Sequence, residues 1–204
     1  KMGAKIKIKG GYIFASAKKG LKGCVIKFPK ISVGATENIL IAACFAKGET
    51  KLRNCALEPE ITDLINFLKK LGCNINQIGK RSINVIGIER LKSTSHKVIF
   101  DRIEAGTYII AAALTKGYLK IKSIDPKIMS TEINLLQKMG VNIIKKKNYL
   151  IVSRSKKLKS INIITEPYPG FPTDLLAQIM VLMTRAEGVS TIKENIFENR
   201  FMHV

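Results

Sequence analysis

The 204-residue sequence has no tryptophan and few other aromatic residues, since phenylalanine and tyrosine together make up only 6% of it. This shortage argues against a surface built to stack nucleic-acid bases. Long apolar runs are missing too, and none approaches the roughly 20 residues that a helix needs to cross a bilayer. We therefore expect no membrane-spanning helix, although a hydrophobic content of 46% is enough to form a buried core in a chain of this length.

Motifs for metals and common cofactors are also missing. Four cysteines, Cys24, Cys44, Cys55 and Cys73, follow no metal-ligand spacing, and His203 has no second ligand close by. No G-x-G-x-x-G follows a strand-like run, and there is no P-loop and no Ser/His/Asp arrangement. We therefore expect no metal and no cofactor, and a reducing cytoplasm is the simplest location for such a chain.

Acidic residues are scarce, so the formal net charge is +20, and 28 of the 35 basic residues are lysine. This surplus could bind the phosphates of a nucleic acid. The lysines are nevertheless spread along the chain, and only residues 143–160 concentrate them. We favour a lysine-rich solvated surface, which would also attract an anionic substrate. A noncatalytic, basic nucleic-acid-binding repeat protein is the alternative.

Three glycines, Gly3, Gly72 and Gly140, recur 69 and 68 residues apart. Gly72 and Gly140 follow apolar residues at helical spacing, whereas only one such residue, Met2, precedes Gly3. A strand-like run comes after each of the three, which is typical of a glycine that ends a helix. On this pattern Met2 is the last core residue of a helix. We therefore expect the chain to be an internal fragment of a longer protein, cut at both ends.

Two kinds of helix alternate within this period. Residues 38–46, 106–115 and 173–184 are apolar nearly all round, which predicts helices buried on every side. Residues 58–72 and 125–140 are amphipathic, with a proline near each start. With the strands between them they predict an α/β fold of β-α-β-α-β-β repeats, in which the buried helices are surrounded by sheet and amphipathic helices.

The starts of the buried helices are candidate binding sites, because a helix N-terminus presents amide groups and partial positive charge. At the first start, Lys30, Ser32 and Gly34 suit a phosphate, since they offer a charge, a hydroxyl and close backbone approach. An ordinary capped helix would show the same residues. Both interpretations stay open.

The other two starts carry acids. Asp101 and Glu104 predict a capping box, and Arg102 between them could point into a cleft. Asp174 stands in the first turn of the third helix, where an acid usually complements the helix dipole. At the edge of a dry interior, a carboxylate there could instead take a proton from a hydroxyl.

Five strings together resemble one family, in order and in spacing: "KISVGATEN", "EPEITDLINFLKKLG", "DRIEAGT", "FPTD" and "FENRFMHV". They are similar to the UDP-N-acetylglucosamine 1-carboxyvinyltransferases, which are enolpyruvyl transferases. The resemblance implies an inside-out α/β barrel fold with two domains, here incomplete. Residues 1–99 would be part of the first domain and residues 100–204 part of the second.

The implied reaction moves the enolpyruvyl group of phosphoenolpyruvate to the 3-hydroxyl of UDP-N-acetylglucosamine and releases phosphate, the first committed step of peptidoglycan synthesis. It would proceed by protonation of the alkene, attack of the hydroxyl and elimination from a tetrahedral intermediate. The sibling 5-enolpyruvylshikimate-3-phosphate synthase shares the fold and is the alternative enzyme.

The resemblance also implies site residues. Asp174 would bind the acceptor hydroxyl and take its proton, Ile196 would contact the nucleotide sugar through its backbone, and Arg200 would organise the closed cleft. The substrate-binding residues implied are Lys30, Ile31, Ser32, Val33, Gly34, Asp174, Ile196 and Arg200. The family's reactive cysteine would lie upstream of Lys1, so we expect the chain alone to be inactive unless the remainder of the enzyme is supplied.

Overall fold

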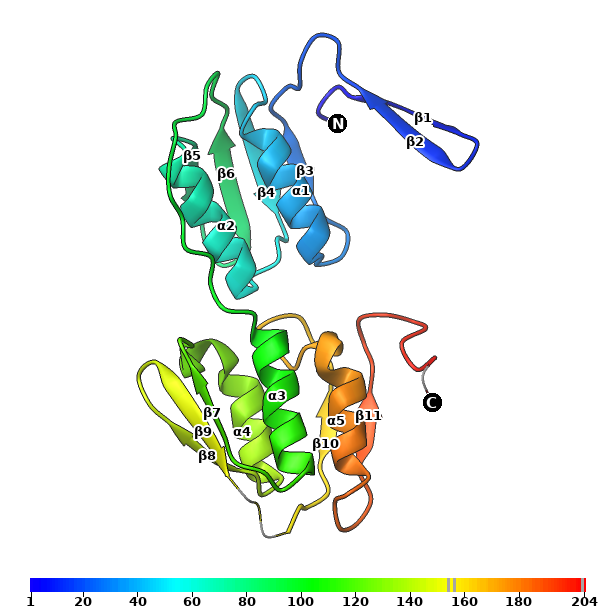
Figure 1. The fold of residues 1–204 in the computed structure, drawn as a ribbon. Helices are drawn as coiled ribbons and strands as arrows, with labels where there is room; N and C mark the ends of the chain where they lie inside the picture. The colour runs from blue at the N-terminus through cyan, green and yellow to red at the C-terminus, as the bar shows by residue number, and fades with distance from the viewer. Residues whose placement is uncertain (154, 156, 203) are drawn as a thin grey trace. The chain divides into compact units, whose positions relative to one another are not determined.

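The computed structural model describes residues 1–153, 155, 157–202 and 204. The chain forms two compact units, Lys1–Val98 and Ile99–Val204, and each has its own hydrophobic core. Figure 1 shows that helices and strands are layered within each unit. The assignment of residues 1–99 and 100–204 to two enolpyruvyl-transferase domains stays a prediction.

Unit 1 contains two helices and six strands: β1 (Lys5–Lys9), β2 (Tyr12–Ser16), β3 (Val25–Lys27), α1 (Val33–Ala43), β4 (Glu49–Arg53), α2 (Pro59–Lys70), β5 (Asn74–Gln77) and β6 (Ser82–Ile86). Strands β3, β4, β6 and β5 form one sheet in that order, in which β3 and β4 are parallel and the other pairs are antiparallel. Helices α1 and α2 lie side by side against this sheet (Figure 1). Strands β1 and β2 form a separate antiparallel hairpin.

The described residues of unit 2 form three α-helices, two short 3-10 helices and five strands: α3 (Arg102–Leu114), β7 (Leu119–Lys122), η1 (Pro126–Met129), α4 (Ser130–Lys138), β8 (Asn142–Lys145), β9 (Tyr149–Ser153), β10 (Asn162–Ile164), η2 (Thr173–Leu175), α5 (Leu176–Met183) and β11 (Thr191–Lys193). Strands β7, β9 and β8 form an antiparallel sheet in that order. Strands β10 and β11 pair in parallel.

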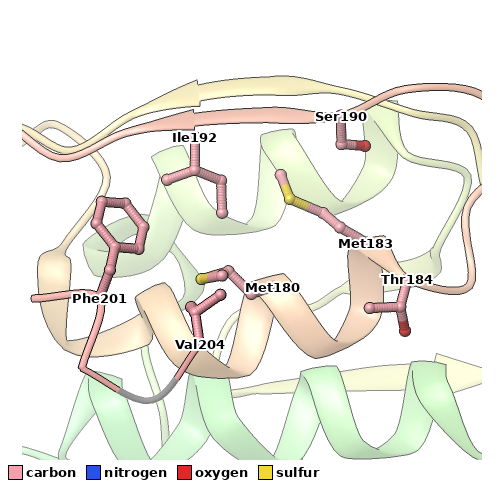
Figure 2. Close-up of a pocket in the computed structure, with 7 residues that line it drawn as sticks. All are labelled: Met180, Met183, Thr184, Ser190, Ile192, Phe201 and Val204. Atoms are coloured by element: carbon pink, nitrogen blue, oxygen red, sulfur yellow. The ribbon is translucent and has the colours of Figure 1, made fainter.

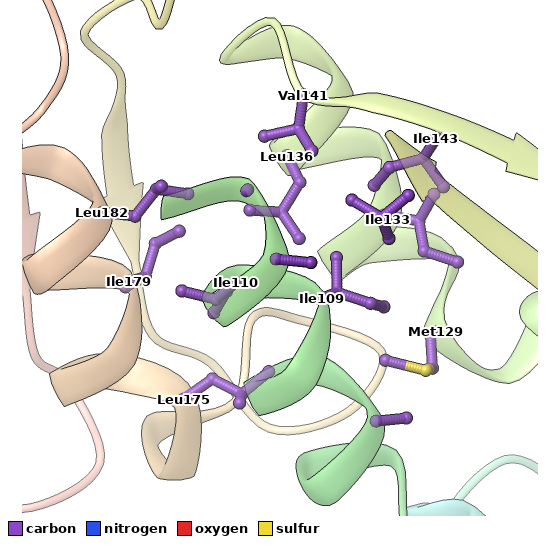
Figure 3. Packing of buried hydrophobic residues seen from close by; sticks show 14 of the residues in the cluster. Ile109, Ile110, Met129, Ile133, Leu136, Val141, Ile143, Leu175, Ile179 and Leu182 are labelled. Carbon is purple, nitrogen blue, oxygen red and sulfur yellow. The ribbon is translucent and has the colours of Figure 1, made fainter. Parts of the chain in front are cut away.

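The core of unit 2 is built around α3. Figure 3 shows Ile109 and Ile110 of α3 between side chains of α4, such as Ile133, and side chains of α5, such as Ile179. Gly106 lets η2 approach α3 closely, because an added methyl group there would lie 2.6 Å from a terminal carbon of Leu175. The apolar character of α3 is therefore explained by its neighbours on two sides.

The expectation that the three apolar helices are buried on every side is only partly met. Helix α3 has seven buried residues, but Tyr108 on it is 56% exposed, Ile41 of α1 is 46% exposed and Val181 of α5 is 51% exposed. The reason is that the described elements of each unit cover these helices on some sides only.

The repeat is visible in the backbone. Gly3, Gly72 and Gly140 all have positive φ, at 89°, 100° and 98°, a conformation that favours glycine. The carbonyl before each glycine accepts a backbone hydrogen bond from a lysine further along the chain: Lys22 to Met2 (2.9 Å), Lys92 to Leu71 (2.8 Å) and Lys159 to Met139 (2.8 Å). The three copies therefore share one closing contact, as their spacing predicts.

The β-α-β-α-β-β order is complete from β3 to β6, but the second copy departs from it. Among the described residues, no strand lies between β6 and α3. The connecting segment packs on α2 instead, where the His96 ring contacts the Asp63 carboxylate at 3.0 Å and Lys70 approaches the Ser95 carbonyl at 3.5 Å. These contacts with α2 replace strand pairing.

Several absences apply to the described part of the chain alone. No helix in it is long and apolar enough to span a bilayer, and no group of His, Cys, Asp and Glu could hold a metal ion. His203 lies outside the described residues. All four cysteines are free. Burial and contact with Cys73 raise the pKa of the Cys44 thiol to about 12, so this pair behaves as core packing.

Candidate active site

The first group of predicted site residues forms the turn that leads into α1. Ser32 is the N-cap of this helix, and its hydroxyl accepts a hydrogen bond from the Ala35 amide at 3.3 Å. The capped-helix interpretation is thus correct for the hydroxyl of Ser32. It does not exclude an anion, because the first-turn amides of Val33 and Gly34 still face the end of the helix.

Gly34 leaves open space at this helix start. A methyl group added there would meet no atom within 4 Å. A ligand could therefore approach the backbone closely. Lys30 lies in the same turn, so the structure groups Lys30, Ile31, Ser32, Val33 and Gly34 as one short surface segment.

The charge around this segment is mixed. Burial raises the pKa of the Glu37 carboxyl, and the neighbouring Glu60 and Glu58 carboxylates raise it further. Three acids therefore lie near the starts of α1 and α2. They would repel an anion, which leaves Lys30 and the amides of α1 as its favourable contacts.

In unit 2, hydrogen bonds shape the approach to Asp174. The Glu166 amide donates to the Phe171 carbonyl at 3.0 Å, and the Thr131 hydroxyl of α4 donates to the Pro169 carbonyl at 2.6 Å. Tyr168–Pro169 is a cis peptide bond. This turn leads to Asp174 in η2, two residues before α5 begins.

Asp174 and Arg200 form an ion pair, with 2.7 Å between Oδ1 and Nη2. Their side chains are 59% and 39% exposed, respectively. The dry interior expected around this carboxylate is therefore not present in unit 2 itself. The pair nevertheless brings together two residues that the sequence places 26 positions apart.

Ile196 joins this group through Glu194, a residue that sequence analysis did not single out. The Glu194 carboxylate accepts hydrogen bonds from the Ile196 amide (2.7 Å), the Phe197 amide (2.9 Å) and the Thr173 hydroxyl (2.8 Å). Asp174, Ile196 and Arg200 are thus assembled within one unit. Their roles toward a substrate stay predictions.

Arg102 does not point into an open cleft, so that expectation is wrong. It is 7% exposed, forms an ion pair with Glu132 of α4 at 3.1 Å, and lies over the Tyr168 ring at 5.6 Å. The sequence held a signal for this pair, since Glu132 falls on the same helical stripe as Leu136 and Met139. An acid in an apolar stripe needs a buried partner.

One mainly apolar pocket of unit 2 is separate from these residues. This pocket lies between α5, β11 and the C-terminal residues (Figure 2), and its volume is about 480 Å³. It is lined by Met180, Met183, Thr184, Ser190, Ile192, Phe201 and Val204. Since none of the predicted site residues lines it, it is not the candidate active site.

Comparison with known proteins identifies relatives over the whole chain. The family model described as EPSP synthase (3-phosphoshikimate 1-carboxyvinyltransferase) matches residues 1–204. The chain is 62% identical to the UDP-N-acetylglucosamine 1-carboxyvinyltransferase of Pelagibacter ubique (strain HTCC1062) over 204 residues, which are 100% of this chain and 49% of that protein. The protein of the same name from Endomicrobium trichonymphae is 50% identical with the same coverage. The chain thus spans about half the length of the curated relatives it matches.

Solved structures confirm the expected fold. The enolpyruvyl transferase NikO from Streptomyces tendae superposes with a TM-score of 0.89 at 24% identity, over 98% of this chain and 51% of that one. An EPSP synthase from Acinetobacter baumannii gives 0.65 at 21% identity, over 94% and 45%. Fold, sequence match and relatives agree that the chain belongs to the EPSP synthase (3-phosphoshikimate 1-carboxyvinyltransferase) family of enolpyruvyl transferases, and that it resembles the UDP-N-acetylglucosamine 1-carboxyvinyltransferases in it.

Proposed function

We propose that this chain is part of an enzyme that transfers enolpyruvyl from phosphoenolpyruvate to the 3-hydroxyl of UDP-N-acetylglucosamine. The observation that carries the proposal is the 62% identity, across all 204 residues, to the UDP-N-acetylglucosamine 1-carboxyvinyltransferase of Pelagibacter ubique (strain HTCC1062). The product would serve peptidoglycan synthesis, and with it cell shape and division. Four free cysteines fit a cytoplasmic location.

Each of the two residue groups, taken by itself, offers contacts for one part of such a substrate. Lys30 and the amides at the start of α1 would bind the diphosphate. Asp174 would accept the proton of the 3-hydroxyl as its oxygen attacks C2 of the protonated enolpyruvyl group. Elimination then breaks the bond between C2 and the phosphate oxygen, removes a proton from the methyl carbon and restores the alkene. Arg200 would hold the Asp174 carboxylate in place through the ion pair.

The proposal can be tested in a completed enzyme. The 204-residue chain would replace the matching 49% of the Pelagibacter ubique relative, which supplies the remaining length. We expect phosphate release that depends on phosphoenolpyruvate and UDP-N-acetylglucosamine, and none when shikimate 3-phosphate is the acceptor. Turnover with shikimate 3-phosphate alone would establish the sibling activity instead. We expect the 204-residue chain alone to release none.

Asp174→Asn tests the proposed base. The amide nearly preserves the shape but cannot accept the proton, so we expect kcat to fall by about 10²–10⁴-fold. Asp125→Asn is the matched control, because Asp125 caps η1 and asparagine caps equally well. Normal turnover by Asp174→Asn would show that Asp174 only supports the helix start.

Salt-sensitive retention of RNA, without any thermal shift from the nucleotide sugar, would favour the noncatalytic nucleic-acid-binding alternative. The net charge of +20 makes this control necessary. It can be run on the 204-residue chain itself.

A further inference from the structure

Glu194 connects the two segments of unit 2 that carry predicted substrate contacts. Its Oε1 accepts from the amides of Ile196 and Phe197, at 2.7 and 2.9 Å. Its Oε2 accepts from the hydroxyl of Thr173, at 2.8 Å, and Thr173 immediately precedes Asp174. One carboxylate therefore joins the segment after β11 to the turn before α5.

The end of β10 belongs to the same network. The Thr165 amide donates to the Lys193 carbonyl at 3.0 Å, and the Thr165 hydroxyl accepts from the Asn195 amide at 2.9 Å. Burial by itself would raise the pKa of Glu194, but hydrogen bonds from Phe197, Ile196, Thr173 and Thr165 outweigh it and lower the pKa. The carboxylate is therefore charged at neutral pH, which makes each of its hydrogen bonds stronger.

Unit 1 shows what the repeat needs at this position. The Phe28 amide donates to the Arg53 carbonyl at 3.1 Å, as Thr165 does to Lys193 in unit 2, so Asn54 is the counterpart of Glu194. Asn54 only donates to the Phe28 carbonyl, at 2.9 Å.

The threonine hydroxyls of the two units differ in the same way. Thr36 stands eight residues after Phe28, as Thr173 stands eight after Thr165, so the two threonines are counterparts. The Thr36 hydroxyl accepts directly from the Ala56 amide at 3.1 Å. In unit 2 the corresponding hydroxyl and amide, of Thr173 and Ile196, are both bound by the carboxylate of Glu194. The fold therefore does not require an acid at this position, and the acid occurs beside the Asp174–Arg200 pair.

We propose that Glu194 is a positioning residue for the transfer reaction: it fixes the Asp174 carboxylate and the Ile196 backbone at the spacing that one nucleotide sugar requires. This inference rests on the proposed function. Displacement of a reacting group by about 1 Å can cost 10²-fold in rate, so a shared anchor for both contacts is expected to matter.

The test measures kcat and KM separately in the completed enzyme. We expect Glu194→Ala to raise KM for UDP-N-acetylglucosamine and lower kcat, with a combined loss in kcat/KM of about 10–100-fold. Thr173→Val, which removes only the hydroxyl, should show part of this loss, and Thr173→Ser should restore the original values. Glu187→Ala is the matched control, because Glu187 is 69% exposed and pairs with an exposed lysine.

A residue that only stabilises the fold would change the melting temperature and leave kcat and KM of the folded enzyme unaltered. That result for Glu194→Ala, with an active unmutated enzyme, overturns the inference and leaves the proposed function standing. An unmutated enzyme that folds but releases no phosphate overturns both.

Hydrogen exchange in the 204-residue chain gives a second measurement that does not need turnover. We expect Glu194→Ala to remove protection of the Ile196 and Phe197 amides while β10 and β11 remain protected. Thr173→Val should leave these two amides protected. Unchanged protection in Glu194→Ala would contradict the anchoring role.

Discussion

Gly34→Ala tests the two interpretations of the first helix start. A cap alone predicts a gain in stability, and a diphosphate site predicts in addition a loss of affinity for the ligand. Gly34 is the second residue of α1, and an added methyl group would meet no atom within 4 Å. Alanine favours a helix more than glycine does, so a helix that is only capped should gain stability. A helix start that also holds a diphosphate should lose affinity, since the methyl group would occupy the space of the ligand.

The expected magnitudes can be measured separately. Glycine lowers the stability of a helix interior by about 0.5–1 kcal/mol relative to alanine. At the second position of a helix the effect is expected to be no larger than this. For a unit of this size the gain corresponds to a melting temperature higher by at most about 2–8 °C. A lost hydrogen bond to a charged group costs about 1.5–3 kcal/mol, which is about 10–150-fold in affinity.

Two assays would follow the variant. Thermal unfolding of the 204-residue chain reports the first effect, and KM for UDP-N-acetylglucosamine in the completed enzyme reports the second. Gly72→Ala is a useful control for unfolding, because its φ of 100° makes alanine strained there. An unchanged KM in Gly34→Ala would refute the diphosphate contact, and a lower melting temperature would refute the open space at the helix start.

Three further predictions concern stability. Glu132→Ala should lower the free energy of unfolding by about 3–5 kcal/mol in denaturant titration, because it leaves a buried arginine without its carboxylate, whereas Glu187→Ala should change it little. Ile75→Ala should cost about 2–5 kcal/mol, but Ile6→Ala, at the same repeat position and 66% exposed, should stay within about 0.5 kcal/mol. Folding lowers the pKa of Glu194 from 4.5, so the stability that this carboxylate contributes is complete above pH 4.5 and is lost as the pH falls through the pKa of the folded state. Melting temperatures measured down to about pH 3 should show this loss of stability, and Glu194→Gln should abolish this part of the pH dependence.

Local sequence signals predicted the elements well. Proline at the first position of α2, the Asp101 cap of α3 and the glycine after each amphipathic stripe are all where the pattern put them. These features depend on a few neighbouring residues, because helix ends are stabilised by side chains within one turn. For the same reason the sequence allowed an ordinary capped helix at residues 30–34 but could not tell whether these residues also bind a ligand.

Contacts between distant residues were not predictable in the same way. The pair Arg102–Glu132 joins residues 30 positions apart, and Thr173–Glu194 joins residues 21 apart. The periodicity of a single sequence predicts which face of a helix is buried, but it does not predict which distant residues contact that face. The charge in the stripe of α4 was a usable signal for the first pair. Nothing local marked Glu194, whose hydrogen-bond partners are two backbone amides and two threonine hydroxyls.

The segment that follows the shared closing contact differs at the point where the chain leaves unit 1. Lys22 and Lys159 themselves also form parallel bridges, with Lys47 and with Glu187, and the backbone after each continues into a β-strand that pairs in parallel. After Lys92 the same closing contact is made, but the next residues bind α2 through His96 instead of pairing as a strand. All three copies of the repeat therefore make the closing hydrogen bond, and only the segment that follows it differs. The repeat can thus either continue within a unit or lead the chain out of it, according to whether the residues after its closing contact pair as a strand.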